Sequence, residues 1–274
     1  MTRLREQDIC DISQMLKSYD NQLLSKTSGC LRDIAIRASG RDNTEAINCA
    51  VKTAVIPLTS GEGIIRGFSE TVCGILCYLG ADAFVTQKTD VAGLSQAVDM
   101  GAEIIFMADD ITCSAMNIKS GKTADNGEFT GKGYAAALDF MSGGVSGKNA
   151  LIIGAGPVGC GAAQFLVTKG AFVRVFDINT QKSEQLKSGK PAIAIEKNLP
   201  DAFKNNVELV VEATPSKSVI EASFLKGTEY IAAPGIPIGL SEEAVKKMNG
   251  GIIHDALEIG VASMFFAVIN SKIR

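Results

Sequence analysis

The chain contains a single histidine, His254, and no run of about 18 consecutive apolar residues. A Ser/His/Asp triad could therefore form only around His254, and a metal site with several histidines is excluded, so no metal is expected. The missing apolar run argues against a membrane-spanning helix, and no membrane partner is expected. Charges are scattered among the apolar positions near the N-terminus, so we expect no signal peptide.

An excess of charge is missing too, because the net charge is −3. That balance gives no reason to expect a nucleic acid as partner. Seven cysteines, an odd number without a short-range pairing pattern, are typical of reduced thiols in the cytoplasm. Cys73 and Cys77 have helical spacing, which favours packed thiols over metal ligands. We expect a cytoplasmic protein whose partner is a small-molecule substrate.

The most informative stretch is a glycine-rich turn between an apolar strand pattern and a helix pattern. Gly154-Ala155-Gly156-Pro157-Val158-Gly159 follows the apolar run 150–153 and opens a segment of small residues. Here Gly154 allows a tight turn, Gly156 lets the backbone approach a pyrophosphate, and Gly159 lets the helix pack close to the strand. The N–H groups at the helix start, near Pro157 and Val158, then face the phosphates. The stretch predicts dinucleotide binding, and the alternative is a glycine-rich turn in an unliganded sheet.

An acidic residue, Asp177, ends the next apolar run, 171–176. An acid in this place accepts hydrogen bonds from the adenosine ribose. A 2′-phosphate would meet the carboxylate, and the following Ile178 and Asn179 supply no cation. The predicted cofactor is therefore NAD rather than NADP.

Strand and helix patterns alternate through most of the chain, which is typical of parallel α/β sheets. We predict a smaller N-terminal α/β domain with leading helices, residues 1–131, and a C-terminal Rossmann-type domain, residues 132–274. Within the first domain, the polar segment 119–131 is expected to be a mobile loop. An apolar final helix, 256–269, is expected to pack back toward the first domain. The expected strands are 53–59, 83–87, 103–108, 150–153, 171–176, 193–196, 207–212, 229–233 and 251–254.

Polar side chains at the carboxyl ends of these strands are the candidates for substrate binding. Thr59 and Ser60 are placed to hold a carboxylate, or alternatively to cap a helix. Asp109 and Asp110 are placed to bind an ammonium group, or to form a turn. An amide partner is expected for Asn117 and Asn126, with turn formation as the alternative. On the nucleotide side, the strand-end candidates for cofactor contact are Thr214, Pro215 and Pro234.

Several of these segments together resemble the pyrrolysine synthase family, PylD. The resemblance extends from about residue 50 to the C-terminus and is weak over the first 45 residues. The motifs in the first domain are not general features of dinucleotide-binding proteins, so the match is specific. The segments that carry it are 56–65 (IPLTSGEGII), 101–110 (GAEIIFMADD), 117–122 (NIKSGK), 212–215 (EATP), 234–237 (PGIP) and 262–264 (ASM).

The resemblance implies oxidation of lysine joined through its Nε to 3-methyl-D-ornithine. A hydride passes from the carbon bearing the terminal ornithine amine to NAD+. The ornithine α-amine attacks the resulting imine, ammonia leaves, and the pyrroline ring of pyrrolysine closes. The family's substrate contacts fall on Thr59, Ser60, Asp109, Asn126 and Asp255. This sequence departs from the family pattern at Glu62, where the family has Asn, and at Asp255, where it has Glu.

Asp109 and Asp255 are the expected catalytic residues. Asp109 is expected to anchor the amine and accept its proton, with Asp255 or water as relay. One rival hypothesis is a dehydrogenase of the shikimate or methylenetetrahydrofolate type, but no lysine stands next to the two strand-end motifs of the first domain. A second rival is a non-catalytic NAD(H) sensor, which would need only residues 149–177. The sequence allows a homodimer without requiring one.

Overall fold

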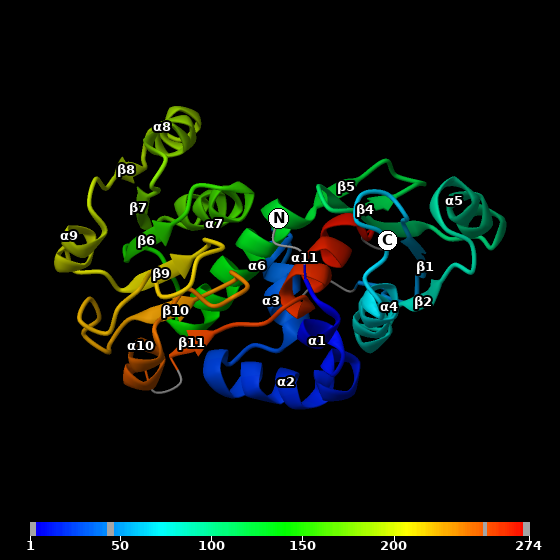
Figure 1. Cartoon of the computed structure of the whole chain (residues 1–274), viewed down its shortest axis with the longest axis horizontal. Coiled ribbons are helices and arrows are strands. Elements are labelled where there is room, and N and C mark those ends of the chain that lie inside the picture. The colour runs from blue at the N-terminus through cyan, green and yellow to red at the C-terminus, as the bar shows by residue number, and fades with distance from the viewer. Residues whose placement is uncertain (1–3, 43–46, 249–250, 271–274) are drawn as a thin grey trace.

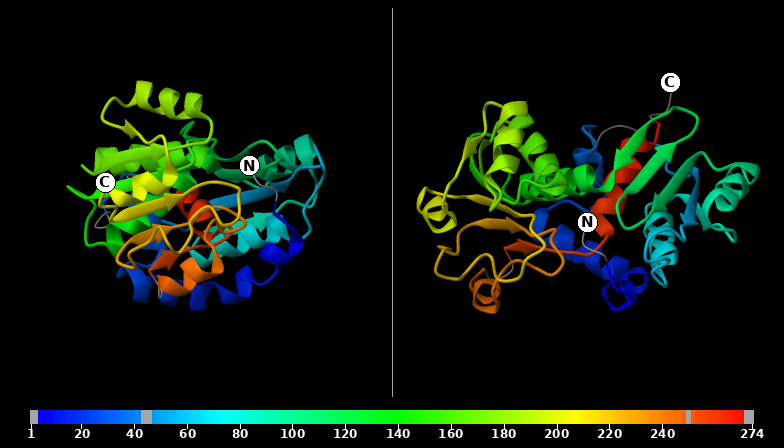
Figure 2. Two further views of the ribbon diagram at one scale, coloured as in Figure 1. Left: turned by 60° about the vertical axis from the view of Figure 1, so that its left-hand side comes forward. Right: turned by 45° about the horizontal axis from the view of Figure 1, so that its top comes forward.

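The computed structural model describes residues 4–42, 47–248 and 251–270, and within them two β-sheets lie on opposite sides of a central group of helices (Figure 1). One sheet belongs to the first half of the chain and the other to the second half. The chain is therefore a two-domain α/β protein, as the sequence predicts. The right-hand view of Figure 2 shows the same separation of the two sheets.

The sheet of the second domain is parallel throughout, with the order β8-β7-β6-β9-β10-β11. Strands β6 and β9 were recognisable because they are buried on both faces and read as apolar runs. The chain reverses its direction of winding between β6 and β9, which is where such sheets bind dinucleotides. The strands are β6 (Asn149–Ile153), β7 (Phe172–Phe176), β8 (Ala194–Ile195), β9 (Leu209–Glu212), β10 (Tyr230–Ala232) and β11 (Ile252–Ile253).

The sheet of the first domain is mixed, with the order β2-β1-β3-β4-β5. The first three strands are parallel, whereas β4 and β5 are antiparallel to their neighbours. The sequence analysis missed both antiparallel strands, because they are short and contain small or polar residues. The strands are β1 (Lys52–Pro57), β2 (Asp82–Val85), β3 (Ile104–Ala108), β4 (Cys113–Asn117) and β5 (Thr123–Asp125).

Helices cover both sheets and fill the space between them (Figure 1). The leading helices α2 and α3 pack against α6, so the N-terminal segment contacts the helical layer that joins the domains. The helices are α1 (Glu6–Ile9), α2 (Ile12–Thr27), α3 (Leu31–Ala38), α4 (Phe68–Tyr78), α5 (Asp90–Asp99), α6 (Asn126–Met141), α7 (Pro157–Thr168), α8 (Thr180–Gly189), α9 (Leu199–Lys204), α10 (Glu242–Lys247) and α11 (Glu258–Val268). In the described part of the chain, none of them has the length and apolarity needed to cross a membrane.

Helix α6 begins at Asn126, inside the segment expected to be a loop. Its early glycines permit very close packing against α7. A Cβ on Gly131 would lie 1.9 Å from the Val158 carbonyl oxygen, and one on Gly161 of α7 would lie 2.1 Å from that of Glu128. Tertiary packing therefore overrides the low helix propensity of these glycines.

The apolar helix α11 packs against α3 and α6 and also against β4 and β5 of the first sheet. Its side chains are buried on every face, as expected of a helix that lies inside a protein rather than on its surface. Figures 1 and 2 show it in red between the two sheets. The segment that follows the six-stranded sheet thus helps to join the two domains.

Candidate active site

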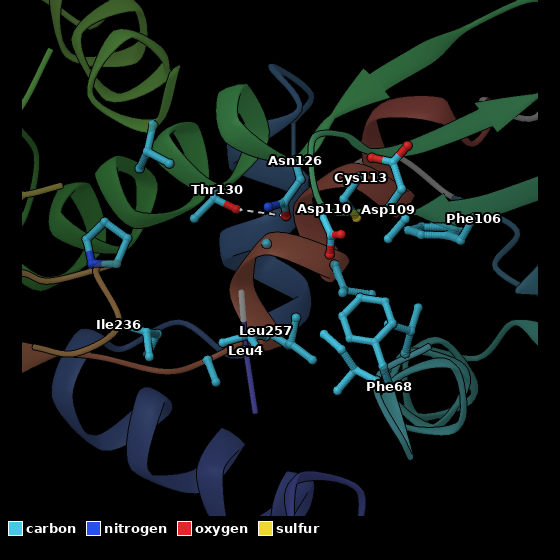
Figure 3. Close-up of a pocket in the computed structure, with 18 of the residues that line it drawn as sticks. Leu4, Phe68, Phe106, Asp109, Asp110, Cys113, Asn126, Thr130, Ile236 and Leu257 are labelled. Atoms are coloured by element: carbon cyan, nitrogen blue, oxygen red, sulfur yellow. Dashed lines mark hydrogen bonds between the residues drawn. The ribbon is translucent and has the colours of Figure 1, made fainter. Parts of the chain in front are cut away.

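A cavity of about 440 Å³ lies between the two domains (Figure 3). The carboxyl ends of β1 and β3 line it from the first domain. Segments that follow β6, β9, β10 and β11 line it from the second, and residues of α4, α6 and α11 complete the wall. Ligands of parallel α/β sheets bind at the carboxyl ends of the strands, and this cavity joins two such edges.

The glycine turn after β6 forms part of the wall through Gly156, Pro157 and Val158. Gly154 has a φ of 98°, which favours glycine, and a Cβ on Gly159 would lie 1.9 Å from the Gly154 carbonyl oxygen. Gly156, by contrast, has no atom within 4 Å of the place where a Cβ would stand. The turn therefore leaves open space beside its backbone at the start of α7, which suits a diphosphate.

Asp177 follows β7 and braces this turn instead of lining the cavity. Its Oδ2 accepts a hydrogen bond from the Ala155 N–H at 2.7 Å, and its Oδ1 accepts one from the Asn179 N–H at 2.7 Å. A carboxylate oxygen can accept more than one hydrogen bond, so capacity remains for a ribose hydroxyl. Among the described residues that line the cavity, Lys182 of α8 is the basic side chain.

Thr214, Pro215 and Pro234 line the cavity from the strand ends of β9 and β10. Their contact with the cofactor stays a prediction. His254 lies at the end of β11, with its Nδ1 2.6 Å from the Ala233 carbonyl oxygen, and its ring is not part of the cavity wall.

Asp109 and Asp110, which follow β3, both line the cavity (Figure 3). Asp109 Oδ1 accepts hydrogen bonds from the N–H groups of Ile111 and Thr112, at 2.8 and 2.7 Å. These N–H groups lower the pKa of Asp109, because they stabilise the carboxylate. Asp110 Oδ2 accepts a hydrogen bond from the Glu62 N–H at 2.6 Å. Both acids therefore also have a turn-stabilising role.

The structure places Thr59, Ser60 and Glu62 in the loop after β1, beside the cavity rather than in its wall. Asp90 holds one end of this loop, since its carboxylate accepts from the Thr59 N–H at 2.8 Å and the Thr59 hydroxyl at 2.7 Å. Asp110 holds the other end through Glu62. The loop is thus tied at two points next to the cavity.

The two asparagines have different surroundings. Asn126, at the start of α6, lines the cavity, and its Oδ1 accepts a hydrogen bond from the Thr130 hydroxyl at 3.1 Å (Figure 3). Asn117, at the end of β4, is buried away from the cavity. Its Oδ1 accepts from the N–H groups of Lys119 and Ser120, each at 3.0 Å, so it stabilises a turn.

Asp255 faces the cavity from the segment between β11 and α11. Its Oδ2 accepts a hydrogen bond from the Tyr19 hydroxyl at 2.8 Å, and its backbone N–H donates to the Tyr134 hydroxyl at 2.8 Å. Burial raises the pKa of Asp255, although the hydrogen bonds to its carboxylate, that from Tyr19 first, act in the opposite direction.

A second acid, Glu258, lies three residues further on and is buried. Burial, and then the charge of Asp255, raise the pKa of Glu258 to about 7. Sequence reasoning missed Glu258, Tyr19 and Tyr134 as site residues. The Glu258 side chain follows Asp255 at helical spacing, which was a usable signal. Nothing in the sequence brings Tyr19 of α2 to Asp255.

Two family models match successive parts of the chain. Residues 8–124 match the family described as "Pyrrolysine biosynthesis protein PylD, N-terminal domain". Residues 127–259 match the family described as "Alanine dehydrogenase/PNT, C-terminal domain". The second domain is therefore an NAD(P)-binding dehydrogenase domain.

Among solved structures, the fold is similar to shikimate dehydrogenase from Aquifex aeolicus, with a TM-score of 0.56 and 16% identity over 82% of this chain and 94% of that one. Quinate dehydrogenase from Corynebacterium glutamicum also has a TM-score of 0.56, with 14% identity over 80% of this chain and 93% of that one. At such identities the likeness concerns the fold alone.

The pyrrolysine synthases of Methanosarcina acetivorans and Methanosarcina barkeri are much more similar in sequence. Each is 34% identical to this chain, and each alignment covers 98% of this chain. The alignments cover 100% of the M. acetivorans protein and 98% of the M. barkeri protein. The leading helices are included in these alignments, although the sequence motifs were weak there. The chain belongs to the pyrrolysine synthase family.

Proposed function

We propose that the chain catalyses the NAD+-dependent oxidation of L-lysine-Nε-3-methyl-D-ornithine to pyrrolysine. One observation carries the proposal: the same cavity is lined by the glycine turn after β6 and by three acids, Asp109, Asp110 and Asp255. The substrate carries several amines, so a wall rich in carboxylates complements its charge. Within the described residues, no lysine of the first domain lines the cavity, which disfavours a mechanism of the shikimate dehydrogenase type.

The residues of the second domain fit NAD+. The open space beside Gly156 suits the diphosphate, the start of α7 supplies N–H groups, and Asp177 supplies ribose acceptors. Asp177 also favours NAD+ over NADP+, because its carboxylate would repel a 2′-phosphate. When bound, NAD+ supplies the hydride acceptor that this chain's own side chains lack.

Asp109 is suited to anchor the terminal ammonium group of the ornithine part. Two main-chain N–H groups lower the pKa of Asp109, so the residue stays ionised in the pH range where the amine is charged. The same property makes Asp109 a poor proton acceptor. The expectation that one residue does both tasks is therefore replaced by a division of labour.

The proton acceptor that the geometry favours is the pair of Asp255 and Glu258. Hydride loss requires a neutral amine, so the ammonium group must first lose a proton. Burial raises the pKa of both acids, that of Glu258 to about 7, and a base with a pKa near neutrality accepts a proton efficiently. Asp255 lines the cavity, and its charge helps to raise the pKa of Glu258, so the two titrate as a pair.

After hydride transfer, the substrate holds an imine at the carbon that carried the terminal amine. The ornithine α-amine attacks this carbon, a proton moves to the departing nitrogen, and ammonia leaves as the ring closes. Attack within one tethered chain is entropically favoured over attack by a free amine. The cavity therefore needs to fold the ornithine part, and Asn126 and Thr130 at the start of α6 lie where they would restrict it.

The direct test is turnover of synthetic L-lysine-Nε-3-methyl-D-ornithine with NAD+. NADH, ammonia and the ring-closed product should appear in equal amounts. NADH without ring closure would place the chain among ordinary amine dehydrogenases. Tight NAD+ binding without turnover of this substrate would support the NAD(H)-sensor alternative instead.

The choice of cofactor has its own test. Asp177→Ala should weaken NAD+ binding by about 1.5–3 kcal/mol, the size of a charge-assisted hydrogen bond, and should reduce the preference over NADP+. Asp201→Ala serves as control, because Asp201 lies on α9 and pairs with Lys204 on the surface. Equal affinities of the unaltered protein for NAD+ and NADP+ would contradict the assignment.

A further inference from the structure

Glu212 is a fully buried acid at the end of β9 that the proposed reaction does not use. It pairs in register with Ile153, the residue that precedes the glycine turn. Burial raises the pKa of Glu212, and within the described part of the chain no cation forms an ion pair with it. Burying a carboxyl group without a cation costs free energy, so its contacts indicate the role of this residue.

The hydrogen bonds that Glu212 Oε1 accepts come from one residue of the cavity wall, Thr214. This oxygen accepts a hydrogen bond from the Thr214 N–H at 2.9 Å and another from the Thr214 hydroxyl at 2.5 Å. The Thr214 hydroxyl oxygen in turn accepts the Ser216 N–H at 3.3 Å. A hydroxyl has one donor and two acceptor positions. The donor and one acceptor of Thr214 are therefore used, and one acceptor is left.

The other half of the Glu212 carboxyl group is enclosed by glycines of the loop after β10. A Cβ on Gly239 would lie 2.2 Å from Glu212 Oε2, and one on Gly235 would lie 3.2 Å from it. Oε2 is buried, and the Gly239 N–H acts against the rise in the pKa of the carboxyl group. Gly235 itself lines the cavity. Glu212 is thus held between the two cavity loops that follow β9 and β10, and its orientation is fixed.

We propose that Glu212 is a positioning residue that fixes the Thr214 hydroxyl as a hydrogen-bond acceptor for the bound dinucleotide. The complementary donors on the cofactor are ribose hydroxyl and carboxamide N–H groups. The inference rests on the proposed use of NAD+, since Thr214 lines the cavity from the second domain, where that proposal places the cofactor. Glu212 acts only through Thr214.

A double-mutant cycle on NADH affinity, measured by fluorescence without substrate, tests this coupling. Thr214→Val and Glu212→Met should each weaken NADH binding about 5- to 20-fold, the effect of one lost hydrogen bond. The double variant should bind no more weakly than Thr214→Val alone. Glu212→Gln and Thr214→Ser should both bind within about 3-fold of the unaltered protein, because the amide oxygen and the serine hydroxyl preserve the contact.

Glu229 provides the matched control, because it is a buried acid of the same domain that also accepts main-chain hydrogen bonds. Its carboxylate accepts the N–H groups of Lys226 and Gly227 at 2.7 and 2.8 Å, before β10 and away from the cavity. Glu229→Met should lower the stability of the fold and leave NADH affinity unchanged. A Glu212→Met variant that behaves in the same way would overturn the proposal.

Two further outcomes decide the matter. If the effects of Glu212→Met and Thr214→Val multiply in the double variant, Glu212 acts independently of Thr214 and the proposal is wrong. Thr214 is partly exposed, so Thr214→Val is expected to fold even if Glu212→Met does not, and unchanged affinity in that variant also overturns the proposal.

An unaltered protein that binds neither NAD+ nor NADH would contradict the proposed function itself. NADH binding without pyrrolysine formation would contradict only the proposed reaction.

Discussion

Asp109 and Asp255 line the same cavity from different domains, but their surroundings are opposite. Asp109 is exposed and accepts two main-chain N–H groups, which lower its pKa. Asp255 is enclosed among Tyr19, Tyr134 and the buried acid Glu258, and burial raises its pKa. The same side chain is therefore stabilised as an anion on one wall and disfavoured as an anion on the other.

This difference separates two tasks that one carboxylate performs poorly together. An acid that remains ionised holds an ammonium group well but retains a proton badly. An acid whose pKa is raised toward neutrality can both accept and release one. Two carboxyl groups whose environments move their pKa values apart are a recurrent arrangement in acid–base catalysis. The comparison leads to four tests, which follow in order of expected effect.

The largest effect is expected from Asp255→Asn. Asparagine keeps the shape and can still accept the Tyr19 hydroxyl, but it cannot take a proton from the substrate. We expect kcat/KM to fall by roughly 10²–10⁴, mainly through kcat, as for loss of a positioned base. Affinity for NADH should remain the same, which shows that the site is intact. A change confined to KM would assign Asp255 to substrate binding alone.

Asp109→Asn should have a smaller effect, and of a different kind. The asparagine oxygen can still accept the N–H groups of Ile111 and Thr112, so the turn is preserved while the charge is lost. We expect KM to rise by about 10- to 100-fold, the loss of a charge-assisted contact, with a lesser change in kcat. Asp110→Asn is the neighbouring control and should change both parameters less. A larger defect in Asp110→Asn would mean that Asp110 is the anchor.

The raised pKa of Glu258 makes the stability of the fold depend on pH. Its pKa of about 7 in the folded protein lies above the ordinary 4.5, so the folded state binds the proton more tightly than the unfolded state. The resulting stabilisation is complete below pH 4.5 and is lost as the pH rises through about 7. It amounts to at most about 3 kcal/mol.

Glu258→Gln should therefore flatten the fall in the free energy of unfolding between pH 5 and 8, as measured by urea denaturation. Glu184→Gln, on the exposed face of α8, removes the same charge and should leave the slope unchanged. An unaltered slope in Glu258→Gln would show that this acid titrates normally.

The smallest effect is expected from Tyr19→Phe. The lost hydroxyl stabilises the ionised form of Asp255, so its removal should raise the pKa of the pair further. At neutral pH, kcat/KM should fall by a few fold, because the acidic limb of its pH profile should move to higher pH. Tyr78→Phe is the matched control, because the Tyr78 hydroxyl donates to Asp20 at 2.7 Å on the surface. Equal pH profiles for both variants would remove Tyr19 from the site.

The second domain was predictable because its signals are local. Buried parallel strands read as apolar runs, and the glycine turn between 154 and 159 has a spacing that few other structures need. The start of α6 was not predictable in the same way. Glycines such as Gly131 argue against a helix until the close approach of α7 is known, since their reason is a contact with Val158.

The site residues also differ in how well the sequence predicts their surroundings. Asp109 and Thr214 follow strands that the sequence predicts, and the structure places them, together with Asn126, in the cavity wall. The surroundings of Asp255 depend on Tyr19, which is 236 positions away in the chain. No local pattern encodes that contact, and it is one of the features that separate the two acids.

The most direct test of this account is a carbon-13 NMR titration of the aspartate carboxyl groups, assigned with Asp109→Asn and Asp255→Asn. The account predicts that Asp109 titrates below the ordinary pKa of 3.8 and that Asp255 titrates above it. The Asp255 signal should also shift when Glu258 is replaced by glutamine. The reverse order of the two pKa values, or a single ordinary value for both, would contradict the division of labour between anchor and proton acceptor.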